Sequence, residues 1–297
     1  HDPFGHFPAR APPLVPRRLR FEVRQRHGAG GKELEPLDED GVAAVAAQIR
    51  AAGAESVAVC FLHSHANNAH EERAATILRA LLPPGVPICT SSGVSPEAGE
   101  YERFSTAAAN AYVQPLVSGY LREAQGRLAE AGFCGPFLLI TSGGGLVDAD
   151  TAAALPVRLV EGGPAGGVRL AEGAARELGV SEVLSLDMGG TTAKVCAVTH
   201  GRAAVAREFE VDRPEHLRRR SGLPVRIPCL DLVEVSGGGG SLASATAVGG
   251  VAVGPRSAGA EPGPACYGKG GIGAAVTDAD VVLGRIDPEN FAAGEVT

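Results

Sequence analysis

Apolar positions in the first hundred residues follow two different periods. Two helices are predicted, over 38–53 and 70–83, because apolar side chains recur there every three or four positions and a glycine or proline follows. Strands are predicted at 18–26, 56–64 and 86–92, where residues alternate or form unbroken apolar runs of strand length. The order strand, helix, strand favours a parallel or mixed sheet covered by helices.

The next hundred residues contain longer helical patterns and more glycine. The pattern is helical over 100–132, and Pro115 either kinks one helix or begins a second. Residues 137–146 are an apolar run that ends in three glycines, which predicts a buried strand. Two helical segments separated by Gly-Gly-Pro follow within 151–179, and another strand is predicted over 201–211.

One stretch, residues 184–198, organises the second half of the chain. Its apolar run reaches Asp187, breaks at Gly189 and Gly190, and resumes after two threonines, which predicts a strand, a tight turn and a strand. Residues 230–254 repeat this order around four consecutive glycines. With the earlier strand that ends in three glycines, three apolar strands run into glycine. Their loops would surround one cleft if the strands are neighbours.

The Gly-Gly turn has two interpretations. Adjacent glycines let an anion approach backbone N–H groups, and the two threonine hydroxyls that follow can donate to a phosphate. The carboxylate of Asp187 can hold Mg2+ through water or orient an attacking oxygen. Glycine is also favoured in hairpin turns for backbone reasons, so a plain hairpin is the alternative. The segment that begins at GGPAGG (162–167) is likewise either an anion-binding helix N-terminus or a helix packed closely on the sheet.

Composition narrows the class of protein. At 297 residues the chain is long enough for two domains, or one large one. The net charge of −7 and the lack of a basic stripe argue against a nucleic-acid-coating surface. The six cysteines lie far apart with no CxxC pair, which predicts reduced core thiols of a cytoplasmic protein. No apolar run approaches the ~18 residues of a membrane span.

Other known functional motifs match the sequence only in part or not at all. GPACYGKG (263–270) matches a P-loop except at its last position, where Gly270 stands in place of the Ser or Thr that would bind Mg2+. Four metal-ligand residues lie close together in sequence, namely His63, His65, His70 and Glu71. They span a strand end, a turn and a helix start, so packing or surface histidines are favoured over a metal site. No nucleophile elbow or dinucleotide fingerprint is present.

Several motifs together carry a family resemblance. In chain order they are LDMGGTTAKV, VEVSGGGGSLA, VGPRSAGAEPGPACYGKGG and VTDADVVLGRIDPENF, with GGPAGGV, ITSGGGL, EYERFSTAAANAYVQPLVSGYL and CFLHSHANNAHEERA upstream. They closely resemble the hydantoinase A/5-oxoprolinase family, which is related to the beta-type subunits of acetone and acetophenone carboxylases. The resemblance covers nearly the whole chain.

The resemblance implies an α/β fold of the actin-like, sugar-kinase-like ATPase type, with mixed sheets covered by helices. Two subdomains would close on ATP and Mg2+. Residues 1–100 would be the remainder of the N-terminal domain, and 101–297 the actin-like ATPase domain. The family's first phosphate loop, an Asp-x-Gly-Gly-Thr hairpin expected near the N-terminus, is absent from these residues. With the proline-rich opening and no initiating Met, this predicts a fragment with an incomplete N-terminal subdomain.

The implied activity is ATP-dependent hydrolysis of a cyclic amide, a hydantoin or a lactam of the 5-oxoproline type. ATP would activate the amide oxygen by phosphorylation, and a hydantoinase B-like subunit or fused B domain would complete the reaction. One alternative is the ATP-consuming subunit of a ketone carboxylase of the acetone or acetophenone type. A second, non-enzymatic alternative is a folded but inactive fragment.

The resemblance also implies roles for individual residues. Asp187 would be the catalytic carboxylate and would lie beside Mg2+. The implied phosphate ligands are Gly189, Gly190, Thr191 and Thr192. The implied residues on the adenosine side of the nucleotide are Gly238, Gly239, Gly240 and Ser241, within SGGGGS (236–241). Weaker candidates are Glu234, Asp278 and Lys194. Two positions depart from the family pattern, because Gly163 stands where Ser is usual and TTAK replaces the more common TSTD.

Overall fold

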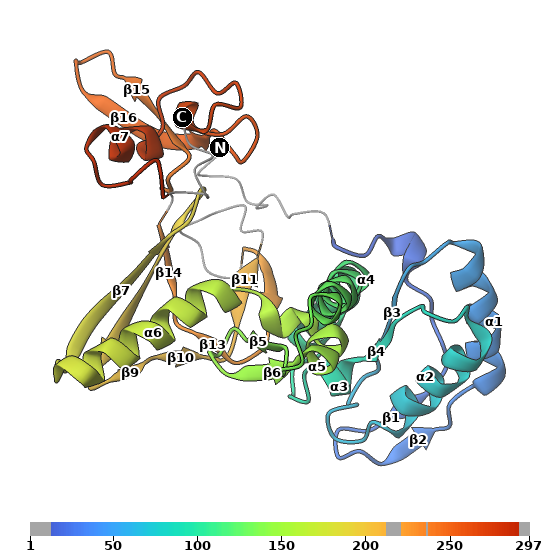
Figure 1. Cartoon of the computed structure of the whole chain (residues 1–297). Coiled ribbons are helices and arrows are strands. Elements are labelled where there is room, and N and C mark those ends of the chain that lie inside the picture. The colour runs from blue at the N-terminus through green and yellow to red at the C-terminus, as the bar shows by residue number, and fades with distance from the viewer. Residues whose placement is uncertain (1–12, 212–220, 236, 291–297) are drawn as a thin grey trace. The chain divides into compact units, whose positions relative to one another are not determined.

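The computed structural model describes residues 13–211, 221–235 and 237–290 of the chain (Figure 1). The chain divides into two compact units. Unit 1 comprises His1–Ala165 and Val205–Cys229, and unit 2 comprises Gly166–Ala204 and Leu230–Thr297. The proline-rich opening lies largely outside the described residues, as does Ser236. The division at residue 100 that the resemblance implies stays a prediction.

A parallel strand pair and two helices form the first part of unit 1. Strand β3 (Val57–Val59) pairs in parallel with β4 (Ile88–Thr90), and α2 (Ala69–Leu81) connects them. Helix α1 (Glu39–Ala51) is capped by Asp38, whose carboxylate accepts a hydrogen bond from the Gly41 amide. The apolar faces of the helices and strands share one core, made of Val42, Ala46, Ile49, Val59, Ala74, Ala75, Leu78 and Leu82. The predicted order of strand, helix and strand is confirmed, although the strands are shorter than predicted.

The predicted strand over 18–26 is wrong for most of its length. A 3-10 turn, η1 (Arg17–Leu19), follows Pro16, and only Arg26 enters a strand. That strand, β1 (Arg26–His27), pairs with β2 (Glu33–Glu35) in an antiparallel hairpin. Alternation of arginines with apolar residues satisfied the strand pattern, but a strand also needs a neighbouring backbone to pair with.

One long helix, α4 (Glu100–Glu130), continues through Pro115. Of the two alternatives at this proline, the structure therefore shows one helix and not two. Short elements pack around its first half: α3 (Ser91–Val94), α5 (Ala149–Ala154), η2 (Pro156–Leu159) and β12 (Leu223–Val225). The side chain of the fully buried Asn110 joins α4 to α5 and η2. It donates a hydrogen bond to Ala154 O at 3.2 Å and accepts one from Val157 N at 3.2 Å. Strand β12 pairs with β11 (Phe209–Val211).

The predicted buried strand over 137–146 is a hairpin instead. Strand β5 (Leu138–Ile140) pairs back onto β6 (Leu146–Asp148) because the three glycines between them turn the chain. Leu138 and Ile140 are 45% and 40% exposed, so the strand is not buried among the described residues. An apolar run in the sequence shows that the side chains are hydrophobic, but it does not show whether other parts of the chain pack against them.

Unit 2 is built around an antiparallel sheet with strand order β14-β8-β7. Its strands are β7 (Glu182–Met188), β8 (Ala193–Thr199) and β14 (Val233–Val235), with β9 (Arg202–Ala203) pairing with β8. Helix α6 (Gly162–Leu178), which begins in unit 1, contributes Glu172 to this sheet, where it accepts a hydrogen bond from the Ala203 amide at 2.7 Å. The predicted strand over 201–211 is divided into β9, β10 (Val205–Ala206) and β11.

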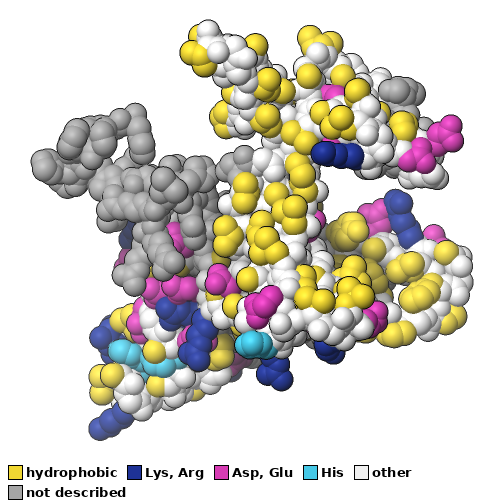
Figure 2. All heavy atoms as spheres, turned by 90° about the vertical axis from the view of Figure 1, so that its left-hand side faces the viewer, with side chains coloured by type: hydrophobic (Ala, Val, Ile, Leu, Met, Phe, Trp, Pro, Cys, Tyr) yellow, Lys and Arg dark blue, Asp and Glu magenta, His cyan; other side chains and the backbone are white. Residues whose placement is uncertain are grey.

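The two faces of this sheet differ. Cys196 and Val198 on one face are buried, whereas Leu184 and Leu186 on the other are 67% and 65% exposed. Figure 2 shows the hydrophobic side chains gathered along these strands. The exposed face also carries Val233, which lies in register beside Val195, the partner of Leu186.

The last part of unit 2 follows β14. It contains β15 (Ser241–Ala245), β16 (Val251–Ser257), η3 (Ala265–Tyr267) and α7 (Val276–Val282). Strands β14 and β15 lie on either side of the four glycines, so the predicted order of strand, glycine loop and strand is confirmed, and β15 then pairs antiparallel with β16. Across the described residues the fold is mixed α/β, as predicted, and none of its helices is long and apolar enough to cross a membrane.

Candidate functional site

The turn between β7 and β8 has the geometry of a tight hairpin. The two strands stay in register up to Met188 and Ala193, so the turn contains only residues 189–192. The Gly189 amide donates to Thr192 O at 2.9 Å and closes the turn. The predicted strand, Gly-Gly turn and strand is therefore confirmed in its structure.

Five hydrogen-bond donors of this turn have no partner among the described residues. Among the described residues, the amides of Gly190, Thr191 and Thr192 donate to no protein atom, and both threonine hydroxyls are also without a partner. Gly190 and Thr191 are exposed. Successive unpaired N–H groups in a turn attract anions, because no other group in the protein satisfies them. The turn therefore offers the donors that a phosphate group needs.

Asp187 lies at the end of β7, directly before this turn. Its register partner on β8 is Lys194, but the Lys194 ammonium pairs with Glu234 on the other side, with Nζ and Oε2 at 2.9 Å. Asp187 is half-buried, and its carboxylate makes no hydrogen bond or ion pair within the described part of the chain. A carboxylate without a partner beside free amides can bind a cation or orient a reacting group.

The second glycine loop, residues 237–241, packs directly on the first. The Gly239 amide donates to Gly189 O at 2.9 Å, and the Gly240 amide donates to Gly190 O at 2.7 Å. A Cβ on Gly238 would lie 2.6 Å from Gly189 O, so only glycine permits this approach. The structure brings together two of the three predicted glycine loops.

The amides of the second loop are already occupied. Besides the two bonds to the first loop, the Gly238 amide donates to Ser241 Oγ at 2.9 Å, and the Ser241 amide donates to Gly238 O at 2.9 Å. An adenosine contact for Gly238, Gly239, Gly240 and Ser241 stays a prediction. Such a contact would have to use the glycine backbone surface, because the N–H groups already have acceptors.

Asp278 has a structural role in the same unit. Its carboxylate accepts hydrogen bonds from the amides of Ala265 at 3.3 Å, Cys266 at 2.7 Å and Ala275 at 2.7 Å. Burial raises the pKa of Asp278, but these hydrogen bonds outweigh it and leave the pKa below the usual value. Asp278 therefore ties the loop that resembled a P-loop to the start of α7.

The four residues of the histidine-rich segment, His63, His65, His70 and Glu71, do not lie together in the structure. Glu71 is fully buried and accepts hydrogen bonds from Phe61 N, from Ser91 Oγ, and from the amide and hydroxyl of Ser92, at 2.6–2.9 Å. His70 contacts Gln25 and Glu33 instead.

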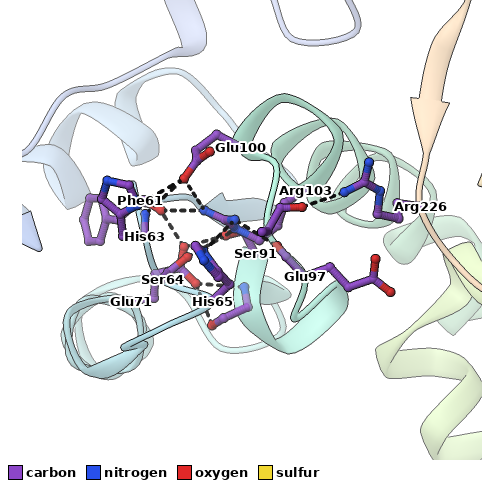
Figure 3. A network of polar contacts seen from close by, with 12 residues as sticks. Phe61, His63, Ser64, His65, Glu71, Ser91, Glu97, Glu100, Arg103 and Arg226 are labelled. Carbon is purple, nitrogen blue, oxygen red and sulfur yellow. Dashed lines mark hydrogen bonds and ion pairs between the residues drawn. The ribbon is translucent and has the colours of Figure 1, made fainter. Parts of the chain in front are cut away.

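His63 and His65 lie near Glu100, at the start of α4 (Figure 3). The structure therefore separates these four residues into a buried carboxylate and two distinct histidine clusters.

Sequence reasoning missed Arg103, whose guanidinium is fully buried. It donates to Ser91 Oγ at 3.1 Å, Glu97 O at 3.0 Å and Phe61 O at 3.1 Å (Figure 3). Through Ser91 it is linked to Glu71, so a buried cation and a buried anion share one hydroxyl. In the sequence Arg103 lies between Glu102 and Phe104 at the start of a predicted helix, and nothing in that pattern indicates a buried side chain.

The start of α6 shows close packing. A Cβ on Gly162 would collide with Ile140 O, whereas Gly163 has open space around it. The close-packing interpretation of GGPAGG therefore holds at Gly162. The anion-binding interpretation stays a prediction.

These features define a mixed α/β protein with a candidate phosphate-binding turn. Two family models match the chain: Hydantoinase/oxoprolinase over residues 103–297, and Hydantoinase/oxoprolinase N-terminal region over residues 6–82. The chain belongs to the hydantoinase/oxoprolinase family, as its motifs predicted.

Known relatives include a hydrolase and a carboxylase. The chain is 35% identical over 300 residues to caprolactamase subunit alpha of Pseudomonas jessenii, covering all of this chain and 42% of that protein. The crystal structure of that ATP-dependent caprolactamase matches with a TM-score of 0.69 and 33% identity, over 97% of this chain and 41% of that one.

A nucleotide-free structure of acetone carboxylase, from work on ATP-dependent acetone carboxylation, matches with a TM-score of 0.76. The identity is 27%, over 97% of this chain and 39% of that one. The chain thus spans about two fifths of the relatives' length.

Proposed function

We propose that this chain forms part of the ATP-binding subunit of an enzyme that hydrolyses a cyclic amide, of the hydantoin or 5-oxoproline type. ATP would activate the amide oxygen by phosphorylation. The amides of Gly190, Thr191 and Thr192 and the carboxylate of Asp187, which have no partner among the described residues, carry this proposal. The ATP-dependent caprolactamase, which is similar over nearly the whole chain, supports it.

The residues present fit a nucleotide phosphate and Mg2+. ATP supplies the phosphoryl group, and Mg2+ neutralises the charge on its oxygens when bound. The turn amides and the Thr191 and Thr192 hydroxyls would donate to the phosphate oxygens. Because Glu234 pairs with Lys194, the negative charge of Asp187 would be left to hold Mg2+ or to orient the attacking oxygen. An actin-like ATPase fold is part of the same proposal.

A ketone carboxylase subunit is the second candidate function. The similarity to acetone carboxylase over 97% of the chain favours it, and ATP activation of a carbonyl oxygen is common to both reactions. Assays of the longer protein with lactams, hydantoins and ketones plus bicarbonate distinguish the two. A hydantoinase B-like partner is proposed because the caprolactamase relative is itself named a subunit. The folded, inactive fragment remains the third alternative, and a cytoplasmic location stays a prediction.

Substitution Asp187→Asn in the longer protein tests the site. ATP turnover should fall by roughly 10^2-fold or more, because the change removes a charge directed at metal and phosphate. The free energy of unfolding should change by less than about 0.5 kcal/mol, because the carboxylate makes no contact that folding needs. Steady-state ATPase rates and urea unfolding measure the two quantities.

Glu182→Gln is the matched control, because Glu182 lies at the other end of β7 and contacts only His200, at 3.8 Å, among the described residues. It should leave ATP turnover unchanged. Near-native turnover in Asp187→Asn would mean that the carboxylate is only a turn residue. An absence of ATP and Mg2+ binding to the longer protein by isothermal titration would contradict the ATPase proposal itself.

A further inference from the structure

A second cluster of polar groups lies in unit 1, at the edge of the parallel strands. The loop after β3 carries His63 and His65, and the chain after β4 leads through α3 to Glu100 at the start of α4 (Figure 3). Ligands of α/β proteins bind preferentially outside the carboxyl ends of parallel strands, because the loops there converge. This cluster takes no part in the proposed ATP site.

We propose that His63, His65 and Glu100 bind a divalent transition-metal cation of the Zn2+ class. One nitrogen of each histidine and one carboxylate oxygen all lie within 4.8 Å of one another. The His63 Nδ1 to Glu100 Oε1 distance is 3.6 Å, close to the separation of about 3.3 Å between two ligands on one tetrahedral ion with bonds of about 2.0–2.1 Å. Small rotations of the rings complete the site.

The His63 and His65 rings are neighbours and are not stacked. Their centroids are 6.2 Å apart and their planes are inclined at 57°. The backbone of His63 has φ 60, a left-handed conformation that few residues other than glycine adopt. The same turn carries its amide toward Glu100 Oε1, at 3.3 Å. The loop conformation therefore holds His63 beside the carboxylate.

Glu100 Oε1 lies 3.7 Å from Arg103 Nη2, an ion pair that is longer than a hydrogen bond and with which a bound cation would compete. Burial raises the pKa of Glu100, but the His63 amide and the Arg103 guanidinium outweigh it and hold the pKa below the usual value. Arg103 is linked through Ser91 to the buried Glu71 carboxylate, which matches its charge. The Arg103 Nη1 contact to His65 Nδ1 is long, at 3.4 Å, and it breaks when that nitrogen binds a cation. Three other acceptors still hold the guanidinium.

Exposure also fits a binding site. The His63 and Glu100 side chains are 26% and 32% exposed, so a cation reaches them from solvent and water can complete its coordination. Imidazole ligands favour Zn2+ or Co2+ over Mg2+, which prefers oxygen. Binding at this cluster is therefore distinct from the Mg2+ expected with ATP.

The other histidine cluster does not fit a metal. His27 and His70 stack with centroids 3.9 Å apart and planes 18° apart, so their in-plane lone pairs cannot meet on one ion. His70 already contacts Gln25 Oε1 at 3.0 Å and Glu33 Oε2 at 2.8 Å through its two nitrogens. This comparison separates a packing cluster from a ligand cluster within the same unit.

Metal titration of the full-length protein, stripped with a chelator and free of nucleotide, tests the proposal. Zn2+ is followed by isothermal titration and Co2+ by its visible absorption. His63→Gln, His65→Gln and Glu100→Gln should each weaken binding at this site at least about tenfold. Glu100→Gln keeps an acceptor for the His63 amide, so it removes the ligand charge with little effect on folding.

The matched control is His200→Gln, because His200 is an exposed histidine beside one carboxylate, Glu182, without a third ligand near it. It should bind both metals as the unchanged protein does. Thermal unfolding in chelator shows whether each variant is folded. Equal stoichiometry and affinity for Zn2+ and Co2+ in the folded variants and the unchanged protein would overturn the proposal.

Discussion

Glu71 in unit 1 and Asp187 in unit 2 are carboxylates in opposite environments. Glu71 is fully buried, and its two oxygens accept four hydrogen bonds from Phe61, Ser91 and Ser92. Asp187 is half-buried, and among the described residues it has no partner. A buried charge must be hydrogen-bonded for the fold to tolerate it. A partly exposed charge without partners adds little to stability and is available to a ligand.

The two glycine loops of unit 2 differ in the same way. The amides of Gly239 and Gly240 bind the carbonyl oxygens of Gly189 and Gly190, whereas the amide of Gly190 itself has no acceptor among the described residues. The second loop therefore supports the first, which keeps its donors free. Groups whose hydrogen bonds are complete stabilise the structure, and groups whose hydrogen bonds are incomplete are the functional candidates.

The largest effect is expected for Glu71→Gln. The change removes the buried negative charge that Ser91 links to Arg103, leaving the guanidinium only its 3.7 Å ion pair with Glu100, and it places an amide NH2 toward donors that need an acceptor. The free energy of unfolding should fall by about 3–5 kcal/mol, measured by urea denaturation. Glu72→Gln is the control, because Glu72 is the next residue on α2 but is exposed. If both variants behave alike, Glu71 is not a structural charge.

Gly238→Ala should have a smaller effect, confined to unit 2. The added methyl group would lie 2.6 Å from Gly189 O and 2.7 Å from Gly190 C, so the two loops must separate. A cost of about 1–3 kcal/mol is typical of such overpacking. Hydrogen exchange at the Gly239 and Gly240 amides should accelerate. Gly237→Ala is the control, since a Cβ there meets nothing within 4 Å, and equal exchange in both variants would contradict close packing.

The smallest effect is a pH dependence of unit 1. Burial, followed by the neighbouring His70, lowers the pKa of His27 from 6.5, although Glu33 partly opposes this. As the pH falls below 6.5, the unfolded chain binds a proton that the folded chain does not, so stability falls. In His27→Gln, the midpoint of urea unfolding should change less between pH 7.5 and 5.5 than it does in the unchanged protein. An equally steep dependence in that variant would assign the effect to other groups.

Local patterns predicted the elements that depend on neighbours in sequence. Helices α1, α2 and α4 follow from apolar spacing and their end signals, and the β7–β8 turn follows from Gly189 and Gly190 between two apolar runs. The family was also evident from motifs in order. The errors at 18–26 and 137–146 arose because strand pairing and burial depend on residues elsewhere in the chain.

The sequence by itself therefore determined the family, the main helices, and the hairpin that places Asp187 beside two glycines and two threonines. Only the tertiary structure decided which of its polar groups are satisfied. Ser91 links Glu71 to Arg103 from twenty and twelve residues away, and the amides of Gly239 and Gly240 reach carbonyls fifty residues earlier. Hydrogen bonds over such distances leave no periodic pattern, because they depend on where the folded chain brings donors and acceptors together.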